Sequence, residues 1–262
     1  MAARRTGVSM RRRTMDDTPA GFGAATRAAL RRSAGTRPRR WLIAVTLLLG
    51  VLAAVGLTAA IPADELTFAA LAHPVQSLMS VAVPFLGTLL AHDLRRSPGT
   101  VRLAPTLLAA ALLAAAVGLL GAVFCAAALA LAPAGGAWQY AGTIVLGGVL
   151  VQVVACLVGV GLGLLLHSFV VAALASIVLP LGFYGLLGAV DAVAPARAWL
   201  TPYATVQNLL AGDMSVIKWV QWVVVLLLWG VGLTAVGMAR LRRRGTAAGP
   251  PAPAAVAGGS RH

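Results

Sequence analysis

The residues of this chain that could perform chemistry are few and widely spaced. The sequence has neither a His-Glu-x-x-His motif, which would place two zinc ligands and a base on one helical face, nor a Gly-x-Ser-x-Gly nucleophile motif. One cluster of side chains from two loops could be drawn as a nucleophile with a base: His92, Asp93, Ser97 and His167. Such residues are typical of the ends of membrane spans. We therefore expect no catalytic residues, no metal and no enzyme activity on this chain.

Six long apolar stretches alternate with polar breaks, and each has the roughly 20 residues that a hydrocarbon layer about 30 Å thick requires. The stretches are 41–61, 70–91, 103–131, 140–166, 169–190 and 219–239. Hydrophobic residues make up 60% of the chain and charged residues only 11%, so a water-soluble globule would expose too much apolar surface. We predict an all-α integral membrane protein whose six transmembrane helices form one domain, 18–240.

The distribution of arginine predicts the orientation. If each stretch spans the membrane, 19 of the 20 arginines share one side with three aspartates, a formal charge of +16, whereas the opposite side carries −2. By the positive-inside rule both termini are cytoplasmic, and the membrane is the inner (cytoplasmic) one. The net charge of +14 does not indicate nucleic-acid binding, because the arginines cluster at span ends, where anionic membrane lipid supplies the opposite charge.

The two ends of the chain lie outside the six spans. Residues 1–17 are basic and predicted to be disordered, and Met1, Met10 and Met15 are all plausible starts. Thr18 can cap a helix that begins at Pro19, and Phe22, Ala25 and Ala29 then repeat at helical spacing. We predict a short interfacial helix there, with a disordered basic tail as the alternative. Residues 241–262 are predicted to be a disordered cytoplasmic tail.

The polar residues within the spans indicate how transport could be driven and what kind of molecule could be carried. No span has a central charged residue, which an ion-coupled carrier usually needs. The only lysine is Lys218, so no Walker A loop can hold ATP and any ATPase is a separate chain. The polar residues in the spans include Thr46, Gln76, Ser77, Thr143, Gln152 and Ser176. They are too few to favour an ion, so a hydrophobic or amphipathic cargo is favoured, although this one sequence does not separate lipid-facing from path-facing positions.

The loop between the second and third stretches carries the most specific signal. It reads His-Asp-Leu-Arg-Arg-Ser-Pro-Gly-Thr-Val-Arg-Leu-Ala-Pro over 92–105. This pattern resembles the loop of membrane subunits of type 2 ABC exporters, with its acidic residue, basic residues, Gly-Thr and later proline. The resemblance implies a loop helix that docks on the ATPase, with the contact formed by Asp93, Arg95, Arg96, Gly99 and Thr100. The chain departs from the family in having Asp where Glu is commoner and in inserting Pro98.

A second feature of the same exporters is the long outer segment before the last span. Residues 191–218 mix apolar and turn-forming residues, among them Pro195, Trp199, Pro202 and Tyr203. The segment is similar to the external region in which short re-entrant helices cap the pathway, and a solvated loop is the alternative.

The resemblance covers residues 20–240 in span number, orientation and two connections. It implies the permease subunit of an ATP-driven exporter for a drug, antibiotic or lipid. Two permeases, identical or different, would enclose the path, and separate ATPase subunits would hold ATP and Mg. An ion-coupled secondary carrier, a membrane enzyme and a non-transporting anchor or immunity protein remain the alternatives.

Overall fold

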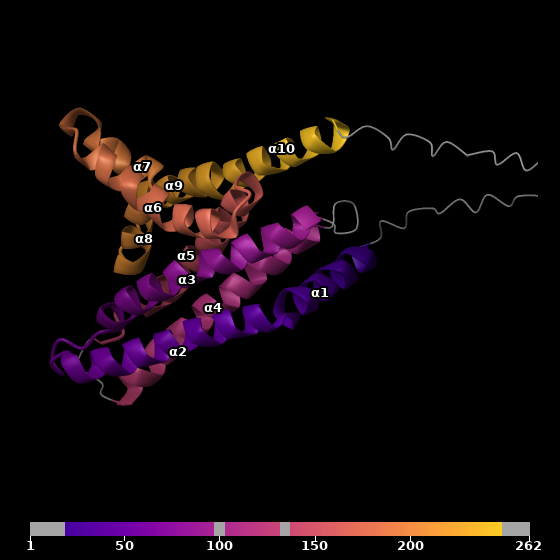
Figure 1. The fold of residues 1–262 in the computed structure, drawn as a ribbon. Helices are drawn as coiled ribbons and strands as arrows, with labels where there is room; N and C mark the ends of the chain where they lie inside the picture. Colours follow the sequence, from indigo (N-terminus) through magenta and orange to yellow (C-terminus); the bar gives the residue numbers. More distant parts are fainter. Residues whose placement is uncertain (1–18, 97–102, 132–136, 248–262) are drawn as a thin grey trace, which may run out of the picture.

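The computed structural model of this protein describes residues 19–96, 103–131 and 137–247 (Figure 1). All regular structure within these ranges is helical. The elements are α1 (Pro19–Gly35), α2 (Arg37–Ala60), α3 (Phe68–Arg96), α4 (Leu103–Leu131), α5 (Ala141–Leu165), α6 (Phe169–Gly188), η1 (Asp191–Ala196), α7 (Arg197–Leu200), α8 (Pro202–Ala211), α9 (Val216–Val225), η2 (Leu226–Gly232) and α10 (Leu233–Ala247).

Six helical stretches are long and apolar enough to cross a membrane, which confirms the predicted number. They are α2 to α6 and the run Val216–Leu241 built from α9, η2 and α10. The spans differ from the prediction mainly at their ends. Helix α3 continues to Arg96 rather than ending near residue 91, because none of residues 92–96 is a proline or glycine that would disfavour the helical conformation. The last span contains a π-helical segment, Leu226–Gly232, that the sequence did not indicate.

Helices α3 and α5 form the centre of the bundle and pack with their backbones close together. An added Cβ on Gly159 would lie 2.1 Å from the backbone oxygen of Pro84, and one on Gly87 would lie 2.2 Å from that of Cys156. Any side chain at these two positions would therefore separate the helices. Small residues drive such close packing in lipid because dispersion contacts, rather than the exclusion of water, hold helices together there.

A buried amide cluster connects α3, α4 and α5 in this central region. The Gln76 side chain donates to the carbonyl of Gly118 at 2.8 Å, and Gln152 donates to the backbone and side-chain oxygens of Gln76, each at 3.0 Å. Both glutamines are almost fully buried. The cluster satisfies most of the hydrogen-bonding groups that the two side chains bring into an apolar interior.

The remaining spans surround this centre. Helix α2 packs on α3 and α4, and α6 packs mainly on α5. Only 17% of the apolar windows of α2 and of α6 is buried, so both present most of their surface to lipid. Helix α1 leads into α2 at the end of the molecule where α10 also ends (Figure 1), and it packs on α4. Cys125 and Cys156 are buried and not bonded to each other.

Candidate functional site

The end of α3 that follows Leu89 is tied to the start of α2 by an ion pair. Arg39 Nη2 lies 2.5 Å from Asp93 Oδ2 and donates to the carbonyl of Leu89 at 3.1 Å. The Arg39 side chain is only 4% exposed, whereas that of Asp93 is 57% exposed. Asp93, which the sequence places at the contact with an ATPase, therefore has a partner within its own chain and still presents much of its side chain outward.

Arg95 connects the same end of α3 to the C-terminal end of α5. Its Nη1 donates to the carbonyl of Gly163 at 3.2 Å and also to that of Leu166. Carbonyls in the last turn of a helix have no N–H partner within it, so a cation that donates to them is favourable. Arg96 is exposed. Gly99 and Thr100, the other two residues of the predicted contact, lie outside the described residues.

Two of the four residues that could form a nucleophile with a base lie at the same place in the structure. His92 and His167 line one very small pocket with Arg95. Asp93 is not among the residues that line this pocket; it pairs with Arg39 instead. Ser97 lies outside the described residues. Within the part of the chain that is described, no group of three or more His, Cys, Asp or Glu residues could hold a metal ion.

The outer segment 191–211 consists of three short helices, η1, α7 and α8. Pro195 lies within η1, Trp199 lies in α7, and Pro202 occupies the first turn of α8. The hydroxyl of Thr201 accepts from the N–H of Ala204 and so caps α8. The helix ends at Gly212, whose φ of 79° suits glycine.

Helix α8 packs into the bundle. Its residues Thr205, Leu209 and Leu210 are buried, and it contacts α3, α5, α6 and α9. His73 of α3 and Gln207 of α8 form a side-chain hydrogen bond of 2.7 Å. Gly147 of α5 lets α8 approach, because an added Cβ there would lie 2.5 Å from the carbonyl oxygen of Leu209. The segment is thus helical rather than an extended loop, and α8 is the part of it that is integral to the helix packing.

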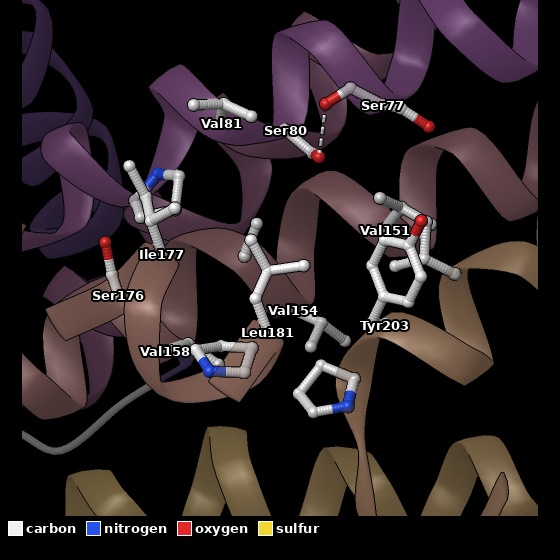
Figure 2. Close-up of a pocket in the computed structure, with 15 residues that line it drawn as sticks. Ser77, Ser80, Val81, Val151, Val154, Val158, Ser176, Ile177, Leu181 and Tyr203 are labelled. Carbon is white, nitrogen blue, oxygen red and sulfur yellow. Dashed lines mark hydrogen bonds between the residues drawn. The ribbon is translucent and has the colours of Figure 1, made fainter. Parts of the chain in front are cut away.

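A cavity of about 250 Å³ lies between α3, α5, α6 and α8 (Figure 2). Its lining consists of aliphatic side chains, three prolines and four residues with hydroxyls. The lining residues are Ser77, Ser80, Val81, Pro84, Val151, Val154, Ala155, Val158, Ser176, Ile177, Pro180, Leu181, Pro202, Tyr203 and Val206. None of them is acidic, basic or a histidine. Ser77 lies nine residues into α3, about 14 Å along the helix axis.

The hydroxyls of the cavity differ in how they are bonded. Ser80 Oγ donates to the carbonyl of Ser77 at 2.7 Å, and Ser176 Oγ donates to that of Ala173 at 2.6 Å. The Ser77 hydroxyl is buried and has no hydrogen-bond partner among the described residues. Figure 2 shows Tyr203 rising from α8 with its hydroxyl directed toward the side of the cavity where Ser77 lies.

Sequence reasoning named several of these residues without recognising the site. Ser77 and Ser176 were among the polar residues of the spans, and Tyr203 was assigned to the outer segment. The structure separates these from Gln76 and Gln152, which bond each other in the core. Ser80 was missed, yet a signal existed: Ser80 and Ser176 each stand four residues before a proline, Pro84 and Pro180.

Comparison of the chain with family models, with curated proteins and with solved structures gave no match.

Proposed function

We propose that this chain is the membrane-spanning permease subunit of an ATP-driven exporter of the type 2 ABC class. Two permease subunits, identical or different, enclose the path, and a separate ATP-binding subunit supplies ATP and Mg. The cargo is hydrophobic or amphipathic, such as a drug, an antibiotic or a lipid. Both termini lie in the cytoplasm, and α1 lies at the inner surface of the cell membrane.

The cavity between α3, α5, α6 and α8 is the observation that carries this proposal. Its lining is aliphatic with a few hydroxyls and no charged side chain, which suits an uncharged amphipathic molecule. Within the described lining there is no carboxylate or histidine through which proton or sodium binding could drive a conformational change. An external energy source is therefore favoured over an ion gradient.

Helix α3 offers a route by which a partner at the inner surface could act on the cavity. The same helix carries Ser77, Ser80 and Pro84 at the cavity and Asp93 and Arg96 at its inner end. The exposed side of Asp93 and the exposed Arg96 present both signs of charge to a partner. A displacement of the inner end of α3 would be transmitted to the cavity along one continuous helix, with no loop between them.

The basic residues of α1 support the assignment of the inner surface. Arg27 and Arg31 are exposed on α1, and Arg37 and Arg40 are exposed at the start of α2. Arginines at this level pair with anionic headgroups of the cytoplasmic leaflet.

The test is purification of the tagged chain from its native membrane in mild detergent, followed by identification of bound proteins and an ATPase assay. A stoichiometric nucleotide-binding subunit with ATP turnover supports the proposal. Arg96→Ala is the informative variant, because Arg96 is exposed whereas Asp93 and Arg95 also hold the fold together. Arg31→Ala, which removes an exposed arginine from α1, is the matched control.

The expected result is that Arg96→Ala reduces recovery of the ATPase subunit and the transport-linked ATP turnover, while Arg31→Ala leaves both unchanged. If no ATPase subunit is recovered under conditions that preserve a known ABC complex, the exporter assignment is wrong. Equal recovery with both variants would place the ATPase contact elsewhere on the chain.

A further inference from the structure

The two spans that face each other across the cavity carry the same local sequence pattern. Ser80 precedes Pro84 by four residues in α3, and Ser176 precedes Pro180 by four residues in α6. All four residues line the cavity. The same pattern therefore occurs on two separate helices at one cavity.

Each pattern changes the backbone in the same way. In a regular α-helix the N–H of a residue bonds the carbonyl four residues earlier. Proline has no N–H, so Pro84 and Pro180 cannot bond the carbonyls of Ser80 and Ser176. A carbonyl released from the helical ladder within hydrocarbon requires another donor, because no bulk water is present. Ser80 and Ser176, which both line the cavity, thus have carbonyls that lack their usual helical donor.

The lining also supplies hydrogen-bond donors. The buried Ser77 hydroxyl has no partner among the described residues, although serine in a helix commonly bonds a carbonyl of the preceding turn. Ser80 and Ser176 show that common arrangement. The Tyr203 hydroxyl is directed toward the same side of the cavity as Ser77 (Figure 2).

We propose that this cavity is a binding site for an uncharged amphipathic molecule that carries both a hydrogen-bond donor and an acceptor. The released carbonyls of Ser80 and Ser176 accept from a hydroxyl or an amine or amide N–H of the ligand. Ser77 and Tyr203 donate to a carbonyl or ether oxygen. Aliphatic side chains such as Val154 and Leu181 contact its apolar part. The volume of about 250 Å³ accommodates a small amphiphile or one end of a larger one.

This inference gives the chemical class of the cargo and so rests on the proposed function, but its test measures binding alone. The probe is an uncharged naphthalene dye with a propionyl ketone and a secondary methylamino group. The reference is its dimethylamino analogue, which has nearly the same shape and no N–H. Binding to the purified full chain is followed by the rise and blue shift of dye emission in an apolar site.

The methylamino dye is expected to bind about fivefold more tightly than the dimethylamino analogue, which corresponds to one neutral hydrogen bond. Pro180→Ala restores an N–H four residues after Ser176, so it should reduce this preference. Pro84→Ala should act likewise on Ser80. Both variants favour a regular helix, so they are not expected to unfold the chain. Ser77→Ala should weaken both dyes, because each carries the ketone.

Leu181→Trp fills the cavity and should abolish saturable binding of both dyes. Val178→Trp, on the lipid-facing side of the same helix, where Val178 is 62% exposed, is the matched control and should bind as the unmodified chain does. Equal affinity for the two dyes, or a preference unchanged by both proline variants, would overturn the proposal. Binding that survives Leu181→Trp would place the dye in the lipid or detergent layer.

The two proposals can fail separately. Saturable, cavity-dependent dye binding without any recovered ATPase would leave the site in place and remove the exporter. An ATPase complex whose permease shows no dye preference would keep the exporter and move its cargo site elsewhere.

Discussion

The ion pair between Arg39 and Asp93 gives the sharpest prediction for stability. Asp93→Asn keeps the size of the side chain and removes its charge. The buried Arg39 then loses the carboxylate that lies 2.5 Å from its Nη2 and keeps the 3.1 Å bond to the carbonyl of Leu89. A guanidinium that is 4% exposed is poorly hydrated, so loss of its counter-charge is costly.

The expected loss of stability follows from how deeply Arg39 and Asp93 are buried. Breaking a fully buried pair by removing one partner costs about 3–5 kcal/mol, whereas an exposed pair contributes about 0–1 kcal/mol. Asp93 is 57% exposed, so water screens part of the interaction, and we expect an intermediate cost of about 2 kcal/mol. For a chain of this size that corresponds to a decrease of roughly 4–8 °C in the midpoint of thermal unfolding.

The measurement is thermal unfolding of the purified chain in detergent, followed by the helical circular dichroism signal. Arg39→Gln and the double variant complete a cycle that isolates the pair. We expect the double variant to be less impaired than the sum of the single variants, because it leaves no buried unpaired charge. Asp93→Asn with an unchanged midpoint, or strictly additive variants, would refute the reasoning.

Three further predictions concern the packing of the bundle. Gln152→Leu should cost only about 1 kcal/mol, measured by the same unfolding assay, because interhelical hydrogen bonds in membranes contribute little on average and Gln76 keeps its bond to α4. Gly159→Ala should prevent recovery of folded protein in size-exclusion chromatography, since its Cβ would meet the α3 backbone at 2.1 Å, whereas Gly182→Ala, with nothing within 4 Å, should be recovered normally. Trp229→Phe removes the indole bond of 2.8 Å to the outer segment and should increase limited proteolysis after α7, with little change in the midpoint of unfolding.

The number of spans and their approximate positions could be predicted because hydrocarbon imposes a length and a composition on each of them. The ends were less predictable. Residues 92–96 belong to the predicted loop between two spans, yet they continue α3, since charged residues do not end a helix and the first proline after residue 91 is Pro98. The π-helical segment in the last span left no signal in an aliphatic sequence.

The contacts at the C-terminal end of α3 were not predictable because their partners are distant in the sequence. Asp93 and Arg39 are separated by 54 residues, and Arg95 and Leu166 by 71. Hydropathy treats Arg39 as one more basic residue before a span, although it is the buried member of the pair. The resemblance to an exporter loop assigned Asp93 and Arg95 to a partner; in the single chain both already bond elements of the bundle, which leaves Arg96 as the most available of the described side chains.

The same distinction applies to the polar residues within the spans. Gln76 and Ser77 are neighbours in the sequence, but consecutive helical residues lie about 100° apart around the axis, so they face different surroundings. Gln76 turns to Gln152 and the core, where its amide nitrogen and oxygen each form a hydrogen bond, whereas Ser77 turns to the cavity with its hydroxyl unpaired among the described residues. A buried polar side chain whose hydrogen-bonding groups are paired within the protein costs little free energy, and helix packing explains its presence. A buried polar side chain that lacks a hydrogen-bond partner beside a cavity destabilises the fold in hydrocarbon. A bound ligand that forms this hydrogen bond removes the penalty. Gln152 Oε1 also lacks a partner among the described residues, but Gln152 does not line the cavity, whereas Ser77 does. Ser77 is therefore the residue of this region that points most directly to a ligand.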